Sequence, residues 1–250
     1  MTAIHIGTSG WSYDHWDGVL YPPGTSPAER LALYVRRFPT AEVNSTFYRW
    51  PPVTTFDGWR RRLPEGFLMT VKAPRGLTHG RRLYAPEQWL ARMEPGLAAL
   101  GDRRGILLVQ VPPQMEYDLP RLSYFLGQVP GWLRTAVELR HPSWQREETF
   151  RLLERHGTAY CVMSGAGLPC VLRATAPFVY VRLHGPDRNF LYAGSYPDDD
   201  LQWWAERIRE WAAQGREVFA YFNNDGEGNA VRNADTLRRL LGQDASPGGL

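Results

Sequence analysis

The chain has 250 residues, of which 43% are hydrophobic and 22% are charged, and its formal net charge is +3 at pH 7. This length and composition can supply the core of a single domain, so no second domain is needed. The mild positive charge permits an anionic ligand and does not by itself indicate nucleic acid. Cys161 and Cys170 are too far apart for a C-x-x-C redox or zinc pair and are expected to be reduced thiols.

The N-terminal residues enter an apolar strand-like segment almost at once, and no apolar run approaches the length of a membrane span. We therefore expect a cytoplasmic protein without a membrane partner. The last residues, 242–250, have the composition of turns and disorder and are expected to fray. The folded domain is predicted to cover residues 1–241.

Eight apolar segments with the character of strands follow one another along the chain: 4–9, 40–47, 67–72, 105–111, 135–140, 158–164, 178–184 and 217–223. Most are followed by stretches with helical periodicity: 28–38, 53–63, 86–100, 119–129, 146–156, 198–214 and 230–241. The link after the sixth strand is short and rich in Gly and Pro, so its helix should be reduced or missing.

Strand and helix in alternation predict a parallel sheet, and eight strands in a chain of 250 residues match a (β/α)₈ barrel of the TIM type. The alternative is an open doubly wound sheet, which normally carries a Gly-rich nucleotide-binding turn after its first strand. Here that turn is Gly7-Thr8-Ser9-Gly10-Trp11, which lacks the G-x-G-x-x-G spacing. The barrel is therefore the preferred architecture.

Side chains alternate between the two faces of a strand, and in most strands one face is aliphatic while the other is polar. The polar face should point into the barrel, near the carboxyl ends where barrel enzymes build their sites. It contains Glu42, Asn44, Lys72, Gln110, Glu138, Arg140, Arg182, His184, Tyr221 and Asn223. We expect these residues to form one site, although an interior lattice of structural ion pairs is an alternative.

Four of these residues are candidate catalytic groups: Glu42, Lys72, Glu138 and His184. A carboxylate such as Glu138 beside the guanidinium of Arg140 stays ionised and can act as a base, and His184 can exchange protons. Lys72 could be an activated amine for Schiff-base chemistry, since burial among cations lowers the pKa of a lysine, but pairing with Glu42 is the more common arrangement.

The candidate substrate-binding residues are Trp11, Asn44, Arg140, His141, Arg182, Tyr221 and Asn223. Guanidinium groups hold oxyanions bidentately, and loops after the seventh and eighth strands commonly bind phosphate in barrels. Trp11, Trp50 and Trp144 could stack on a sugar or base at the mouth, although packing against the rim explains them equally well.

No metal and no other cofactor is predicted. The sequence has no H-x-H or H-E-x-x-H spacing, and the interior cations Lys72, Arg140 and Arg182 would repel a divalent ion. No Walker loop, G-x-S-x-G elbow or redox signature is present.

Several ordered segments resemble the YecE-like family, domain of unknown function 72. They are Ile6-Gly7-Thr8-Ser9-Gly10-Trp11, Glu42-Val43-Asn44-Ser45-Thr46-Phe47-Tyr48, Val71-Lys72-Ala73 with Thr78-His79, Val137-Glu138-Leu139-Arg140-His141-Pro142-Ser143-Trp144, Tyr180-Val181-Arg182-Leu183-His184-Gly185 and Tyr221-Phe222-Asn223-Asn224-Asp225. The resemblance spans nearly the whole chain. It implies a (β/α)₈ barrel and no established reaction.

The leading hypothesis is a barrel enzyme of isomerase, lyase or hydrolase type that performs metal-independent acid–base chemistry on a small anionic, sugar-like or nucleotide-like compound. Glu138 and His184 would exchange protons, and Arg140 with Arg182 would hold the anion. A nucleic-acid-binding protein or phosphodiesterase, similar to endonuclease-IV-like barrels, is the first alternative. A barrel that binds a ligand without catalysis is the second.

Overall fold

A computed structural model describes residues 2–243 of the chain. Its eight strands follow one another in a closed, parallel barrel in the order β1 to β8. The strands are β1 (Ile4–Ser9), β2 (Thr40–Val43), β3 (Leu68–Lys72), β4 (Arg104–Gln110), β5 (Thr135–Glu138), β6 (Ala159–Ser164), β7 (Phe178–Leu183) and β8 (Glu217–Phe222). The predicted TIM-type barrel is therefore confirmed.

The helices are α1 (Pro27–Arg37), α2 (Ser45–Tyr48), α3 (Val53–Arg62), α4 (Pro86–Ala99), α5 (Leu119–Gln128), α6 (Glu147–Arg155), α7 (Asp198–Ala213) and α8 (Asn229–Leu240). A π-helix spans Gly76–Gly80, and short 3₁₀ helices span Asp14–Trp16, Gly101–Arg103, Pro142–Trp144 and Gly226–Gly228. The link between β6 and β7 has no helix in the described chain, as its Gly/Pro content predicts. Within residues 2–243, none of the helices combines the length and apolar composition that crossing a bilayer requires.

Five strands, β2, β4, β5, β7 and β8, end earlier than the sequence pattern predicts. The predicted second strand continued to Phe47, but β2 ends at Val43 because Asn44 adopts helical backbone angles (φ −92°, ψ −21°) and leads into α2. Similarly, β5 ends at Glu138 and β7 at Leu183, so Arg140 and His184 lie just beyond their strands. Alternation of side chains holds only within a strand, and the predicted inward direction of Asn44 loses its basis.

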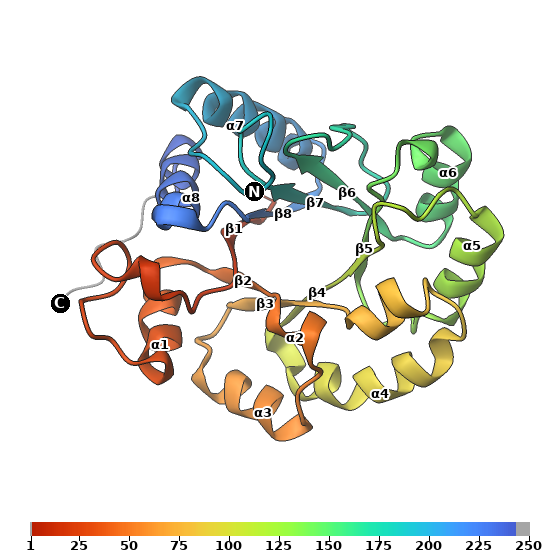
Figure 1. The fold of residues 1–250 in the computed structure, drawn as a ribbon, viewed down its shortest axis with the longest axis horizontal. Helices are drawn as coiled ribbons and strands as arrows, with labels where there is room; N and C mark the ends of the chain where they lie inside the picture. The colour runs from red at the N-terminus through yellow and green to blue at the C-terminus, as the bar shows by residue number, and fades with distance from the viewer. Residues whose placement is uncertain (1, 244–250) are drawn as a thin grey trace. The chain divides into compact units, whose positions relative to one another are not determined.

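The chain is organised as two compact units, which we describe separately. The first comprises residues 2–42, 163–168 and 181–243. In it β1 pairs in parallel with β8 over Ile4–Thr8 and with β2 at Ser9 and Glu42. Helix α8 packs on both β1 and β8, and α7 lies beside α8 (Figure 1). After α8, the side-chain amide of Gln243 donates to the Ile4 carbonyl of β1 at 2.8 Å.

The second unit comprises residues 43–162 and 169–180. Its strands β3, β4, β5 and β6 form successive parallel pairs, and Gln110 lies opposite Glu138 in the β4–β5 register. Helices α3, α4, α5 and α6 pack in succession outside these strands (Figure 1). The aliphatic face of the strands, including Met69, Val71 and Val109, is fully buried, as the predicted alternation requires. Of the predicted disordered tail, 242–250, Gly242 and Gln243 are hydrogen-bonded to the end of α8, and residues 244–250 lie outside the described residues. The single-domain boundary stays a prediction.

Candidate functional site

In the first unit, a completely buried carboxylate is held by a hydroxyl and a guanidinium. Glu42 Oε1 accepts hydrogen bonds from Ser9 Oγ at 2.5 Å and from Arg182 Nη2 at 2.7 Å, and the three residues have no exposed surface. Glu42 lies on β2 and Arg182 on β7, which are not neighbours in the barrel. Their bond therefore crosses the interior, and both side chains point inward as the strand pattern predicts.

Tyr13 covers this cluster from the loop after β1. Its hydroxyl donates to the Ser9 carbonyl at 2.8 Å, and a Cβ atom at Gly10 would lie 2.6 Å from the same hydroxyl. The chain needs glycine there, because Gly10 also has a positive φ of +84°. Burial, together with the charges of Asp225 and Glu42, raises the pKa of Tyr13. The phenol therefore remains a neutral hydrogen-bond donor over the physiological range.

His184 is also completely buried, one residue beyond β7. The Asn223 amide Nδ2 donates to His184 Nδ1 at 3.1 Å, which assigns the proton of the neutral imidazole to Nε2. The backbone around it is fixed, because His184 N donates to the Ser164 carbonyl at 2.7 Å and Tyr192 N donates to the His184 carbonyl at 2.6 Å. His184 and Asn223, which the sequence assigns to one site without pairing them, are therefore in contact.

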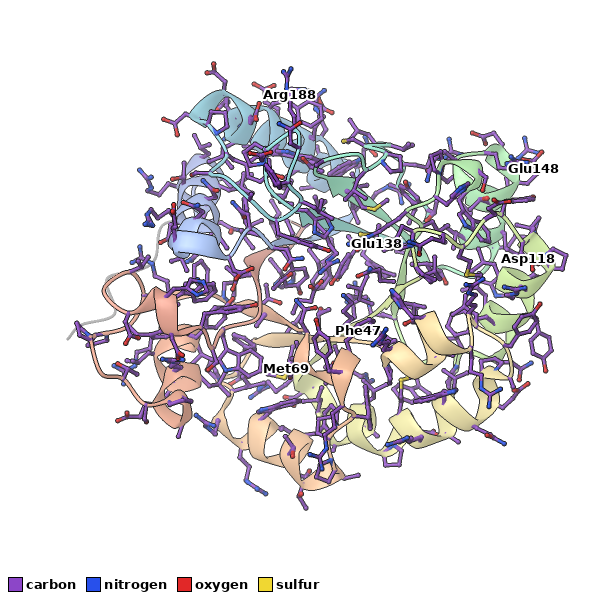
Figure 2. All side chains as sticks on the ribbon, viewed as in Figure 1. Phe47, Met69, Asp118, Glu138, Glu148 and Arg188 are labelled. Atoms are coloured by element: carbon purple, nitrogen blue, oxygen red, sulfur yellow. The ribbon has the colours of Figure 1, made fainter. Side chains whose placement is uncertain are left out.

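In the second unit, Glu138 and Arg140 form the predicted pair at the end of β5. Arg140 Nε donates to Glu138 Oε1 at 2.5 Å, and Cys161 Sγ lies 3.9 Å from Glu138 Oε2. Glu138 has no exposed surface and Arg140 retains 8%. Figure 2 shows Glu138 on the inner side of β5, whereas Asp118 and Glu148 lie at the outer helices. The bond through Nε fixes the orientation of the guanidinium plane.

Gln110 lies across from Glu138 in the sheet register and is 6% exposed. Its Oε1 atom is buried and has no hydrogen-bond partner among the described residues. A buried amide oxygen without a donor is costly, so such an atom marks a place where a ligand hydroxyl or water would be stabilised.

Lys72 and His79 both contact the ring of Phe47 in this unit. Lys72 Nζ lies 4.6 Å from the centroid of the Phe47 ring, and the His79 ring meets the same phenyl group edge-on at 5.0 Å. Figure 2 shows Phe47 reaching from α2 toward the strands of this unit. Lys72 and His79 are both half-buried, so this group keeps contact with solvent.

His79 is held neutral by its surroundings. Desolvation, followed by the positive charges of Lys72, Arg75 and Arg140, lowers its pKa to about 4, and Glu138 opposes the shift only in part. Three cations and one carboxylate therefore act on one imidazole.

Thr78 holds the His79 ring in place. Thr78 Oγ1 lies 3.2 Å from the Pro74 carbonyl oxygen and 3.0 Å from His79 Nδ1. The hydroxyl therefore ties the imidazole to the backbone before the π-helix.

Other predicted residues have local roles in the structure. His141 Nδ1 bonds Ser143 Oγ at 2.8 Å, and Tyr221 is completely buried with its hydroxyl 2.7 Å from Thr40 Oγ1. Trp11 is half-buried, and its carbonyl accepts from Tyr21. Trp144 has no exposed surface and donates to the Met115 carbonyl at 2.7 Å, so it packs in the core and cannot stack on a ligand. Asn44 is half-buried beyond β2.

The sequence placed His79 on the rim beside Lys72 and Tyr13 in an aromatic loop at the mouth, but it indicated no role for two residues that the structure brings to these clusters, Ser9 and Phe47. One signal was available, because Lys72 is the only lysine among the 29 lysine and arginine residues of the chain. Among residues 2–243, no group of three or more His, Cys, Asp and Glu side chains is arranged to hold a metal ion.

The fold and these clusters define the class of the protein: a parallel (β/α)₈ barrel with paired charges at the carboxyl ends of its strands. Residues 5–248 match the family model described as "Protein of unknown function DUF72", and the chain belongs to this family. The resemblance to the YecE-like family is thereby confirmed.

Known relatives agree with this assignment. The UPF0759 protein YunF of Bacillus subtilis (strain 168) is 29% identical over 273 residues, covering 95% of this chain and 94% of that protein. The UPF0759 protein YecE of Escherichia coli (strain K12) is 28% identical over 142 residues, covering 56% of this chain and 50% of that protein. A crystal structure of a DUF72 family protein from Thermotoga maritima MSB8 has a TM-score of 0.84 and 28% identity, covering 96% of this chain and 99% of that chain.

Proposed function

We propose that this DUF72 barrel binds a small anionic compound at the second unit's cluster and performs acid–base chemistry on it. The observation that carries the proposal is the excess of positive charge around His79, where Lys72, Arg75 and Arg140 act against the single carboxylate of Glu138. A partly desolvated group in which cationic side chains outnumber carboxylates is a favourable place for an oxyanion. The same excess would repel a divalent metal ion.

The first unit's ion pair supports a different role. Arg182 is bonded to Glu42 at 2.7 Å and both are completely buried, so their charges compensate each other. This pair fits the structural alternative better than the predicted role of Arg182 in holding the anion. The exchange of protons between Glu138 and His184 stays a prediction from the sequence.

Within the second unit, each residue has a distinct proposed task. Arg140, oriented by Glu138, and Lys72 would bind the anionic group. Glu138 would act as the base toward a substrate hydroxyl or acidic C–H, because a carboxylate held by a guanidinium remains ionised. Gln110 would accept a hydrogen bond from a substrate hydroxyl through its buried Oε1.

Calorimetric titration with inorganic phosphate tests the anion site directly. Arg140→Gln should weaken phosphate binding by roughly tenfold or more, since a charge-assisted hydrogen bond contributes about 1.5–3 kcal/mol. The matched control is Arg92→Gln, which removes the same charge from an exposed arginine that lies over Trp89 in the same unit. Equal affinities of the two variants, or no phosphate binding by the wild type, would refute the proposal.

Nucleic-acid binding, the alternative hypothesis, can be tested with the same two variants. The alternative would be favoured by an oligonucleotide that binds tightly at high salt. Its affinity should also change no more with Arg140→Gln than with Arg92→Gln. Binding that disappears as salt is added would indicate only nonspecific phosphate contacts.

A further inference from the structure

We propose that Lys72 is an amine nucleophile that forms a Schiff base with the carbonyl carbon of a small anionic aldehyde or ketone. This inference rests on the proposed function, because it takes the second unit's cations to hold the anionic group of the same compound. It adds the substrate class and a covalent step.

Lys72 differs chemically from the other cationic side chains of this protein. Lys72 is the only lysine in the chain, and every other cationic side chain of the lysine and arginine type is a guanidinium. A guanidinium binds an oxyanion at least as well as an ammonium, because its planar fork matches the anion's geometry. An amine can do what a guanidinium cannot, which is to lose its proton and attack a carbon atom. The chain is rich in arginine and has its one lysine at position 72. We therefore infer that the nucleophilicity of the amine is used at this position.

The position of Lys72 in the fold also suits a nucleophile. Lys72 is half-buried at the carboxyl end of β3, with Nζ held 4.6 Å from the Phe47 ring centroid. The ring positions the amine. Lys72, Arg75 and Arg140 all act on the neighbouring His79 imidazole, and Glu138 acts on it with the opposite sign. One amine, two guanidinium groups, one carboxylate and one imidazole are thus gathered together.

The reaction balances without any other reagent. Lys72 is half-buried and keeps contact with solvent, so its ammonium gives a proton to water, and the nitrogen lone pair forms a C–N bond to the carbonyl carbon. Proton transfer within the adduct gives the neutral carbinolamine. The hydronium ion returns a proton to the carbinolamine hydroxyl, which leaves as water as the C=N bond forms. Ammonium and carbonyl become a protonated imine and water, with no net gain or loss of protons.

Having a single lysine makes the test unusually specific. The protein is incubated with glyoxylate and cyanoborohydride, which reduces an imine to a stable secondary amine, and the adducts are located by peptide mass spectrometry. The N-terminal amine is the only other primary amine in the sequence, and it provides an internal reference. We expect labelling of Lys72 to exceed that of the N-terminus by about tenfold or more, a difference of about 1.4 kcal/mol in activation free energy.

Three comparisons separate an activated lysine from an ordinary one. Glycolaldehyde, a neutral aldehyde of similar size, should lose most of the preference for Lys72. Arg140→Gln should lower the rate with glyoxylate, and Arg92→Gln should not. Lys72→Arg should remove the internal adduct while the N-terminal adduct and the circular dichroism spectrum persist.

The outcomes also separate this inference from the proposed function. Phosphate binding by the wild type without selective labelling of Lys72 would overturn the Schiff-base step and leave the anion site in place. Selective labelling with both aldehydes but no phosphate binding would support the amine chemistry and overturn the anion preference. Labelling of Lys72 no faster than the N-terminus, in a protein that binds no phosphate, would overturn both.

Discussion

Replacing His79 with glutamine is expected to remove a loss of stability that the wild-type protein undergoes between pH 7 and pH 4. In the folded protein, desolvation and three nearby cations lower the pKa of His79 from 6.5 to about 4. The unfolded chain retains the ordinary value. Below pH 6.5 the unfolded state therefore binds a proton that the folded state does not, and the free energy of unfolding falls with decreasing pH. The loss is complete below about pH 4, and above pH 6.5 His79 contributes none.

The magnitude follows from the difference between the two pKa values. A difference of about 2.5 corresponds to at most about 3.4 kcal/mol, at about 1.36 kcal/mol for each pKa unit. His79 is only half-buried, so solvent screening reduces the effect to about 1–1.5 kcal/mol. This is a measurable fraction of the stability of a typical domain.

Urea denaturation at several pH values, in phosphate-free buffer, measures this quantity. As the pH falls from 7 to 4, the free energy of unfolding of the wild type should drop by about 1–1.5 kcal/mol more than that of the His79→Gln variant. His156→Gln, the same replacement at an exposed histidine, is the control. Added phosphate should raise the pKa of His79, observed by nuclear magnetic resonance, because an anion offsets the nearby cations. A pH-independent difference between His79→Gln and wild type would refute the reasoning.

Two further substitutions test the first unit. Arg182→Met should lower the free energy of unfolding, measured by urea denaturation, by about 3–5 kcal/mol, because it leaves the Glu42 carboxylate buried without its cation. A double variant that also carries Glu42→Leu should recover part of that loss. If the losses of the two single variants simply add up in the double variant, the pairing of Arg182 with Glu42 is contradicted. Gly185→Ala should destabilise by about 2–3 kcal/mol, because φ is +98° and its Cβ would lie 2.2 Å from the Ala193 carbonyl oxygen. The control is Gly194→Ala: φ is +81° there, but no atom would lie nearer than 3.5 Å to the added Cβ, so the loss of stability should be only about 1 kcal/mol. Equal losses at the two glycines would show that the contact between the residue 185 Cβ and the Ala193 carbonyl oxygen does not matter.

The sequence by itself determined the barrel and the inward faces of most strands. Alternation of strand and helix patterns predicts a parallel sheet, and side-chain alternation predicts which residues turn inward. Glu42, Glu138 and Arg182 are buried accordingly. This works because hydrophobic periodicity is a local property of the chain and reports burial directly.

Strand ends could not be predicted in the same way. Asn44 follows Glu42 at a spacing of two, which places it on the same face only if the strand continues. The backbone turns into α2 at that residue. A single residue with helical backbone angles is enough to remove the relation between spacing and direction.

Only the tertiary structure decided how the charges pair. The sequence offered Lys72 as a partner for Glu42, but Glu42 accepts hydrogen bonds from Arg182 on β7 and from Ser9 on β1. Partners separated by 140 positions cannot be identified from local patterns, because packing brings them together. The same packing compensates Arg182 and leaves an excess of cations around His79, which local sequence could not reveal. The candidate site therefore depends on which opposite charges come within hydrogen-bonding distance when the strands assemble.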